Sequence, residues 1–211
     1  IVLRANGGRG LRYSTPLVDN IGVFSTGKKF VGAYDKHILE DAWTVGGNIT
    51  YYMPFGASSN TYLSFDYFRT QFAQQMVVDY ECPTEHPAIH FYALNGKRSY
   101  TDNFQVDFSV DPIERFNITA TFRYTNARIE LEGRGLVEKP MTSQYKGVLN
   151  LQYATNLNRW IFDFTASVNG PCRVYDFMKD MDGIKMKNGK YYSPVYPLLY
   201  AQVTRRFKGW D

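Results

Sequence analysis

Hydrophobic and polar residues alternate along much of this chain, and the segment FQVDFSVDPIERFNITATFRY shows the pattern most clearly. Apolar residues from Phe104 to Val110 alternate with polar ones, and the same alternation runs from Phe116 to Tyr124. The five residues DPIER separate the two runs. This period of two predicts an antiparallel hairpin with one apolar and one polar face. The alternation does not tell which face is inside, because a membrane barrel turns its apolar face outward.

The same alternation predicts an all-β fold with almost no helix. The expected strands cover 1–11, 42–53, 60–79, 98–110, 115–128, 143–154, 159–169 and 196–208. The best helical candidate is the segment 15–25, where Thr15 can cap and Pro16 occupies a first-turn position. No linker, repeat or low-complexity tract divides the sequence. We therefore expect one unit over 1–211, an antiparallel up-and-down meander of about eight long strands.

The connections between the expected strands alternate in length. PFGASSN, DPIER and TNLNR are short, whereas the other connections run from about a dozen to about thirty residues, well beyond ordinary hairpin loops. Short turns on one side and long loops on the other are typical of outer-membrane barrels. Soluble up-and-down barrels also carry uneven loops, so this feature leaves both classes open.

The aromatic residues on the apolar phase fall at two levels. Phe108, Phe116, Tyr153, Trp160 and Phe207 lie near the short-turn end, and Trp43, Tyr67, Tyr124 and Tyr145 lie near the opposite end. The eight residues from Phe116 to Tyr124 span about 26 Å along a strand. With a tilt near 40° this is about 20 Å along a barrel axis, close to the roughly 25 Å band between aromatic girdles. The pattern predicts a lipid-facing girdle; in a soluble sandwich or lipocalin-like barrel, large aromatic residues usually lie mid-strand in the core.

The polar phase of the same strands would line the lumen of a wide barrel. Its predicted lumen-facing residues are Arg4, Asn6, Asp66, Gln105, Asp107, Arg123, Asn150, Gln152, Asp163 and Gln202. A soluble sheet would expose the same residues to solvent, so they discriminate weakly between the two classes.

Composition excludes several classes of protein. Aromatic residues make up 17% and charged residues 21% of the chain, and the mean hydropathy of −0.37 is too polar for a bundle of membrane helices. The net charge of +4, without a basic patch interleaved with aromatic residues, does not indicate a nucleic-acid partner. No nucleophile–base constellation or metal-activation motif is present, so we expect no enzyme activity and no cofactor.

Several stretches, in order along nearly the whole chain, resemble TonB-dependent outer-membrane receptors. The stretches are LRANGGRGLR, STPLVDNIGVFSTGKK, LEDAWTVGGNITYYM, LSFDYFRTQFAQQMVVDYE, HFYALNGKRSYTDNFQVDFSVDPIERFNITATFRYTNA, EKPMTSQYKGVLNLQYATNLNRWIFDFTASVNG and YPLLYAQVTRRFKGWD. Each motif is loose, but their ordered succession is specific. The resemblance is strongest to receptors for iron-siderophores or cobalamin.

The resemblance implies a 22-stranded barrel in the bacterial outer membrane, enclosing an N-terminal plug domain. Substrate binds at the outer side, and the TonB protein pulls on a short N-terminal segment to release the plug. This chain would supply about eight wall strands and extracellular loops, while the plug, the TonB-contacting segment and the final strands lie outside it. Its expected partners are the plug, the TonB complex, outer-membrane lipid, lipopolysaccharide and a nutrient chelate. In isolation it should form either a curved open sheet with two unpaired edges or a strained closed barrel.

Two alternatives to a receptor remain open. A passive porin-like barrel would share the lipid-facing pattern. A soluble β-barrel or sandwich would bind a small apolar ligand in its interior.

Four features of the long loops carry possible chemistry. Glu81, Cys82, Glu85, His86 and His90 offer metal-ligand types without a second cluster, and Asp176, Asp180 and Asp182 offer a calcium site that lacks the EF-hand spacing. Both are more simply read as solvated loops, and we assign no metal and no substrate-binding residue. Cys82 and Cys172 are either a disulfide or two free thiols. Six lysines lie in long loops on one side: Lys28, Lys29, Lys36, Lys185, Lys187 and Lys190. The hypothesis is that some of them pair with lipopolysaccharide phosphates; the alternative is that they only solubilise the loops.

Overall fold

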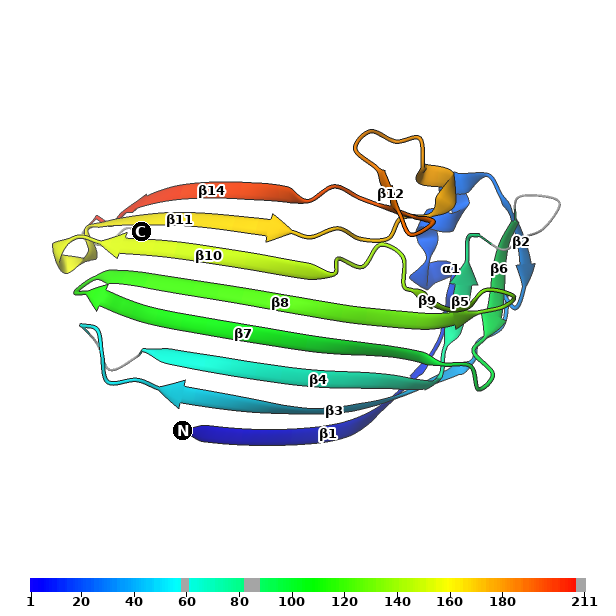
Figure 1. Ribbon diagram of the computed structural model, residues 1–211, viewed down its shortest axis with the longest axis horizontal. Helices are drawn as coiled ribbons and strands as arrows, with labels where there is room; N and C mark the ends of the chain where they lie inside the picture. The colour runs from blue at the N-terminus through cyan, green and yellow to red at the C-terminus, as the bar shows by residue number, and fades with distance from the viewer. Residues whose placement is uncertain (58–60, 82–87, 208–211) are drawn as a thin grey trace.

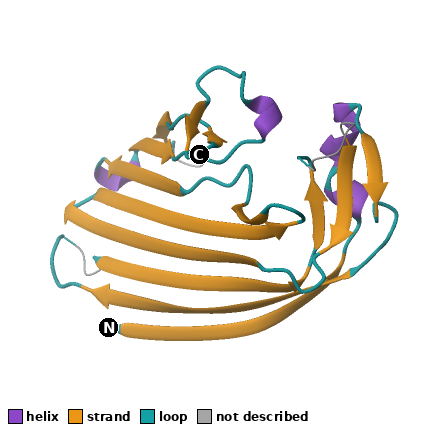
Figure 2. Cartoon of the chain, turned by 45° about the vertical axis from the view of Figure 1, so that its right-hand side comes forward, coloured by secondary structure: helices purple, strands orange, loops and turns teal. Residues whose placement is uncertain are grey.

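A curved antiparallel sheet forms most of the molecule (Figure 1, Figure 2). The computed structural model describes residues 1–57, 61–81 and 88–207. Its eight long strands are β1 (Val2–Tyr13), β3 (Leu39–Tyr52), β4 (Tyr62–Gln74), β7 (Ser99–Ile113), β8 (Phe116–Leu131), β10 (Tyr145–Ala154), β11 (Trp160–Asn169) and β14 (Tyr196–Arg205). Each pairs with the next in this order, and the short β9 (Gly135–Glu138) pairs with β8. The fold is all-β, with 65% strand and 8% helix, and the sheet is not closed.

The eight long strands confirm the predicted meander, with two corrections. The expected strand 60–79 is two strands, because β4 ends at Gln74 and β5 (Met76–Asp79) belongs to another sheet. Gln75 lies at this break, and its backbone carbonyl accepts a hydrogen bond from the backbone N–H of Leu94 at 2.9 Å. The prediction that the five residues DPIER connect the two strands is also wrong. β7 continues through a register shift to Ile113, so the turn consists of Glu114 and Arg115.

The long connections fold together beyond one end of the sheet, and we call this region the loop lobe. It comprises residues 14–38, 75–81, 88–98, 132–144 and 170–195. Its elements are α1 (Pro16–Asp19), η1 (Ile21–Thr26), β2 (Lys29–Gly32), β5, β6 (Ala88–Ala93), β9, η3 (Asp176–Met178), β12 (Lys185–Lys187) and β13 (Lys190–Tyr192). Strands β2, β6 and β5 form a separate three-stranded sheet in which β2 and β6 run parallel. Figure 1 shows the lobe at the right, opposite the short turns and the small η2 (Asn156–Asn158).

The predicted helix at 15–25 is confirmed as the short α1 followed by η1, but its predicted cap is wrong. The Thr15 side chain makes no capping hydrogen bond to the helix backbone. Its hydroxyl donates instead to Asp19 Oδ1 at 3.0 Å, and its backbone N–H donates to Asp19 Oδ2 at 3.1 Å. No helix in the part of the chain that the structure describes is long and apolar enough to cross a membrane.

Buried apolar side chains concentrate in the loop lobe rather than on the sheet. One cluster consists of Val77, Leu94, Ile129, Leu131 and Val137, and a second of Val23, Met76, Ile89 and Phe91. Ile129 and Leu131 lie at the C-terminal end of β8, so the first cluster joins the lobe to the sheet. Along the rest of the sheet the large apolar side chains are exposed, as Phe65 at 48% and Phe122 at 50% illustrate. The apolar face of the sheet is therefore not a core within this chain.

Candidate functional site

The apolar face of the sheet is a continuous surface whose composition follows from strand register. Residues directly opposite each other on paired strands share a face. One aromatic row crosses four adjacent strands, with Tyr67 opposite Phe104, Phe104 opposite Tyr124, and Tyr124 opposite Tyr145. Nearer the short turns, Phe116 lies opposite Tyr153 and Tyr153 opposite Phe162.

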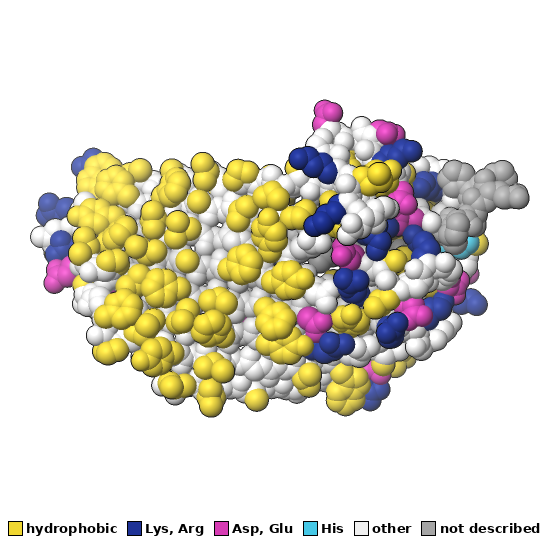
Figure 3. All heavy atoms as spheres, viewed as in Figure 1, with side chains coloured by type: hydrophobic (Ala, Val, Ile, Leu, Met, Phe, Trp, Pro, Cys, Tyr) yellow, Lys and Arg dark blue, Asp and Glu magenta, His cyan; other side chains and the backbone are white. Residues whose placement is uncertain are grey.

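We call the apolar surface between these rows, with the rows themselves, the apolar belt. Its larger members include Leu3, Ile49, Phe65, Tyr67, Phe104, Val106, Phe108, Phe116, Ile118, Ala120, Phe122, Tyr124, Tyr145, Leu149, Leu151, Tyr153, Phe162, Phe164 and Val203. Figure 3 shows this surface as a broad yellow field, with charged side chains gathered mostly at the lobe end.

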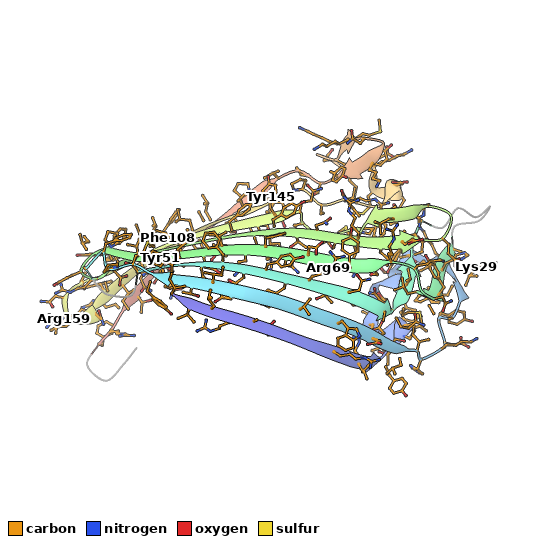
Figure 4. The ribbon with its side chains drawn as sticks, turned by 60° about the horizontal axis from the view of Figure 1, so that its bottom comes forward. Lys29, Tyr51, Arg69, Phe108, Tyr145 and Arg159 are labelled. Carbon is orange, nitrogen blue, oxygen red and sulfur yellow. The ribbon has the colours of Figure 1, made fainter. Side chains whose placement is uncertain are left out.

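The register places the predicted girdle on this one face. Trp43, Tyr67, Phe108, Phe116, Tyr124, Tyr145, Tyr153 and Trp160 all share it. Phe207 follows β14, and the Arg205 guanidinium lies 4.5 Å from its ring centroid. Two members sit away from their predicted rows along the strands, because Phe108 lies opposite Ala120 and Trp43 lies opposite Gln71. In Figure 4 the labelled Tyr51, Phe108 and Tyr145 lie between Arg159 at the short-turn end and Arg69 toward the lobe.

Within the described residues, the charged side chains on this face lie beyond the two aromatic rows that bound the apolar belt, and arginines there lie over aromatic rings. Toward the lobe, Arg9 lies 5.4 Å from the Trp43 centroid and Arg69 lies 4.5 Å from that of Tyr100. At the short-turn end, Arg205 lies 4.9 Å from the Trp160 centroid. A cation over an aromatic face keeps its charge at the polar border while its stem covers apolar surface.

The opposite face of the sheet is polar and carries a ladder of side-chain hydrogen bonds. Asn48 Nδ2 donates to Ser64 Oγ at 2.7 Å and to Asp66 Oδ1 at 2.8 Å, and Gln152 Nε2 donates to Asp163 Oδ1 at 2.7 Å. All ten predicted lumen residues share this face: Arg4, Asn6, Asp66, Gln105, Asp107, Arg123, Asn150, Gln152, Asp163 and Gln202. The face is not uniformly polar, since Phe68 and Tyr200 also lie on it.

A buried ionic cluster joins three connections within the loop lobe. Glu81 Oε2 accepts hydrogen bonds from Arg134 Nη1 at 2.9 Å and from Arg173 Nη2, and Glu81 Oε1 accepts from the Asp176 N–H at 2.7 Å. Arg134 Nη2 also donates to Asp79 Oδ2. The side chains of Asp79, Glu81 and Arg173 are only 2%, 6% and 5% exposed. Buried charges of this kind persist only when paired, so the cluster ties the three connections together.

Aromatic stacking adds a fourth connection to this unit. The rings of Tyr80 and Tyr175 lie 5.0 Å apart, those of Tyr175 and Phe177 lie 5.3 Å apart, and Lys28 Nζ lies 4.3 Å from the Phe177 centroid. Burial raises the pKa of Tyr175 to about 12, because the anionic phenolate would be poorly solvated there. The segment that carries Lys28 also supplies β2, which pairs with β6. All four long connections are therefore held as one body.

The sequence did not identify this lobe arrangement, and its metal candidates do not converge. No group of three or more His, Cys, Asp or Glu residues within the described ranges is placed to hold a metal ion. Asp180 and Asp182 are exposed, and Asp176 contacts Glu81 through its backbone. Glu81 is occupied by arginines and His90 lies in β6, whereas Cys82, Glu85 and His86 lie outside the described residues.

The remaining loop predictions have separate outcomes. Cys172 has its Sγ 3.4 Å from Ser193 Oγ, and Cys82 lies outside the described residues, so the choice between a disulfide and two free thiols stays open. The six lysines Lys28, Lys29, Lys36, Lys185, Lys187 and Lys190 all lie in the loop lobe. Their attraction to lipopolysaccharide stays a prediction.

Comparison with known proteins finds no matching family model, no matching curated protein and no matching solved structure.

Proposed function

We propose that this chain forms part of the wall and extracellular loops of a TonB-dependent outer-membrane receptor. The receptor would import a scarce nutrient chelate of the siderophore-iron or cobalamin class. The observation that carries this proposal is the apolar belt, which crosses the sheet without a charged residue and is bordered at both ends by arginines over aromatic rings.

Exposure of the apolar belt to water would be unfavourable. Large apolar side chains such as Phe65, Phe104 and Phe122 are about half exposed across neighbouring strands. Monomeric soluble proteins rarely expose contiguous apolar patches beyond a few hundred Å². Lipid contact removes this cost, and the belt's height of about 20 Å is close to the apolar band of transmembrane barrels.

The open sheet supports a larger wall rather than a complete small barrel. In the part of the chain that the structure describes, β1 and β14 lie at opposite edges and each pairs with one neighbouring strand. In hydrocarbon, each unpaired backbone polar group costs several kcal/mol, so these edges need further strands. A 22-stranded barrel, the size implied by the receptor resemblance, would supply them.

The two ends of the sheet suit the two sides of an outer membrane. The turn at Glu114 and Arg115 has two residues, whereas the loop lobe contains the four long connections. Outer-membrane barrels place short turns in the periplasm and longer loops outside. The lobe would accordingly face the exterior, where lipopolysaccharide, the lipid partner named above, presents its phosphates.

A matched pair of substitutions tests whether the belt contacts lipid. Leu149 and Val148 are neighbours on opposite faces with nearly equal exposure, 38% and 40%. In lipid vesicles, Leu149→Arg should lower the free energy of unfolding by about 2–4 kcal/mol, because it places a charge at mid-depth, whereas Val148→Arg should have little effect. Equal effects of the two substitutions, or a monodisperse protein without detergent, would instead favour a soluble ligand-binding sheet.

The transport assignment needs a test of its own. Cells that carry the protein should take up a labelled ferric siderophore or cobalamin, and the same cells without TonB should lose that uptake. Uptake that persists without TonB would identify a passive porin-like barrel instead. Absence of uptake for both labels would reject the proposed substrate class while leaving the belt test unaffected.

A further inference from the structure

A cavity of about 380 Å³ lies in the loop lobe beside the end of the sheet. Its size falls in the range of small-molecule sites, roughly 300–1,000 Å³. Its walls are formed by β5, the end of β8, α1, and the two connections that carry Lys139 and Tyr175. It is therefore built by all the connections that the ionic cluster and the tyrosine stack hold together.

The acidic groups in the cavity wall are already occupied. Glu40 accepts hydrogen bonds from the Arg12 guanidinium at 2.7 Å and from the Met76 N–H at 3.0 Å. Asp19 accepts from Thr15 and lies 3.3 Å from Arg12 Nη2. Asp79 and Glu81 are held by the two arginines of the ionic cluster. The wall therefore has little unused capacity to bind a cation.

Several donors in the same wall have no acceptor. Within the described part of the chain, no hydrogen bond is formed by the ammonium of Lys139, the hydroxyls of Tyr80 and Tyr175, or the amide nitrogen of Gln75. Burial raises the pKa of both tyrosines, so their hydroxyls stay protonated at neutral pH. Lys139 is exposed as a residue, but partial desolvation of its ammonium lowers its pKa, with an opposing contribution from Glu40, and an anionic ligand would stabilise its charge.

One side of the wall is apolar. Met76, Val77, Ile129 and Leu131 line the cavity, and the last three belong to a buried cluster. A ligand that satisfies both kinds of wall needs one anionic group and a compact apolar body.

We propose that this cavity binds a small amphipathic carboxylate, with its carboxylate at Lys139 and its ring or branched alkyl body against Val77, Ile129 and Leu131. The tyrosine hydroxyls and the Gln75 amide donate to its remaining oxygen lone pairs. The proposal does not rest on membrane insertion, because the cavity lies in the loop lobe and outside the apolar belt.

Titration calorimetry of the purified protein in a mild nonionic detergent tests the site. The probe is 2-naphthoate, and 2-naphthamide is its neutral analogue of the same shape. The protein should bind 2-naphthoate at least about tenfold more tightly than the amide, since a charge-assisted hydrogen bond is lost in the amide. Equal affinity for the two probes, or no binding of 2-naphthoate, would overturn the proposal, and this comparison needs no variant.

Variants then assign the charge to one residue. Lys139→Met keeps the apolar stem and should weaken 2-naphthoate binding at least about tenfold, whereas Lys139→Arg should retain most of it. Lys187→Met removes the same charge from the exposed β12 and serves as the matched control. An unchanged affinity in Lys139→Met, or an equal loss in Lys187→Met, would contradict the assignment.

Discussion

Individual charged residues in this protein differ mainly in what surrounds them. Glu81 is almost fully buried and accepts hydrogen bonds from two arginines and a backbone N–H. Glu132, by contrast, pairs with Lys97 while keeping 60% of its side chain exposed. Water screens the second pair and not the first, so equal-looking ion pairs should contribute unequally to stability.

Glu81→Gln should loosen the loop lobe. It removes the charge that pairs with Arg134 and Arg173, and breaking one partner of a buried pair typically costs about 3–5 kcal/mol. Amide hydrogen exchange at Asp176 and in 132–144 should accelerate accordingly. Glu132→Gln is the control and should change exchange by no more than about 1 kcal/mol. Similar effects of both substitutions would mean that the buried cluster does not hold the lobe.

Tyr175 should ionise late in an alkaline titration. Burial raises its pKa from 10.0 to about 12, so the fold favours the neutral phenol. This contribution is complete below pH 10 and is lost as the pH rises toward about 12. Ultraviolet absorbance of tyrosinate should show a late component from Tyr175 and Tyr92, whose pKa is also raised to about 12. Tyr175→Phe should reduce the amplitude of that late component. If the substitution instead reduced only the tyrosinate absorbance that develops near pH 10, the burial of Tyr175 would be contradicted.

At the scale of elements, regular alternation of apolar and polar residues predicted the long strands. Elements that depend on contacts between distant parts of the sequence were not predicted by it. β7 and β8 alternate over many residues, so their faces follow from local sequence alone, and with them most of the apolar belt. β5 reads MVVD and is buried on both faces, so it carries no alternation, and the sequence alone does not separate it from β4. The ionic cluster joins Glu81 to Arg173, which are 92 positions apart, and no local pattern signals such a contact.

The turn between β7 and β8 offers a stabilising change. Arg115 has a φ of 67°, a left-handed conformation that costs a residue with a Cβ about 1–2 kcal/mol. Arg115→Gly should therefore raise the free energy of unfolding by about 0.5–1 kcal/mol after the extra chain entropy of glycine is subtracted. Urea unfolding from lipid vesicles measures the change. Glu114→Gly, where φ is not positive, should instead be destabilising, and equal losses in both variants would refute the turn conformation.

The whole molecule divides into a lobe with its own apolar core and a sheet without one. The lobe buries Val77, Leu94, Ile89 and Phe91 within the chain, whereas large belt residues such as Phe65 and Phe122 contact neighbours on the sheet but stay about half exposed. Sequence alternation established that the two faces differ but not which environment each meets. That choice depends on surroundings, and the border of arginines over aromatic rings is the observation that favours lipid.

The height of the apolar belt has a consequence for bilayer thickness. In the proposed membrane location, a band of about 20 Å would be shorter than the roughly 30 Å hydrocarbon core of an average bilayer, and the arginines at both borders would resist being drawn inside. Such hydrophobic mismatch is relieved when the surrounding lipid thins. The protein should fold faster and unfold at higher urea in dilauroyl- than in dioleoylphosphatidylcholine vesicles. The sheet would thereby favour thin membranes over thick ones, and it would thin the lipid beside it.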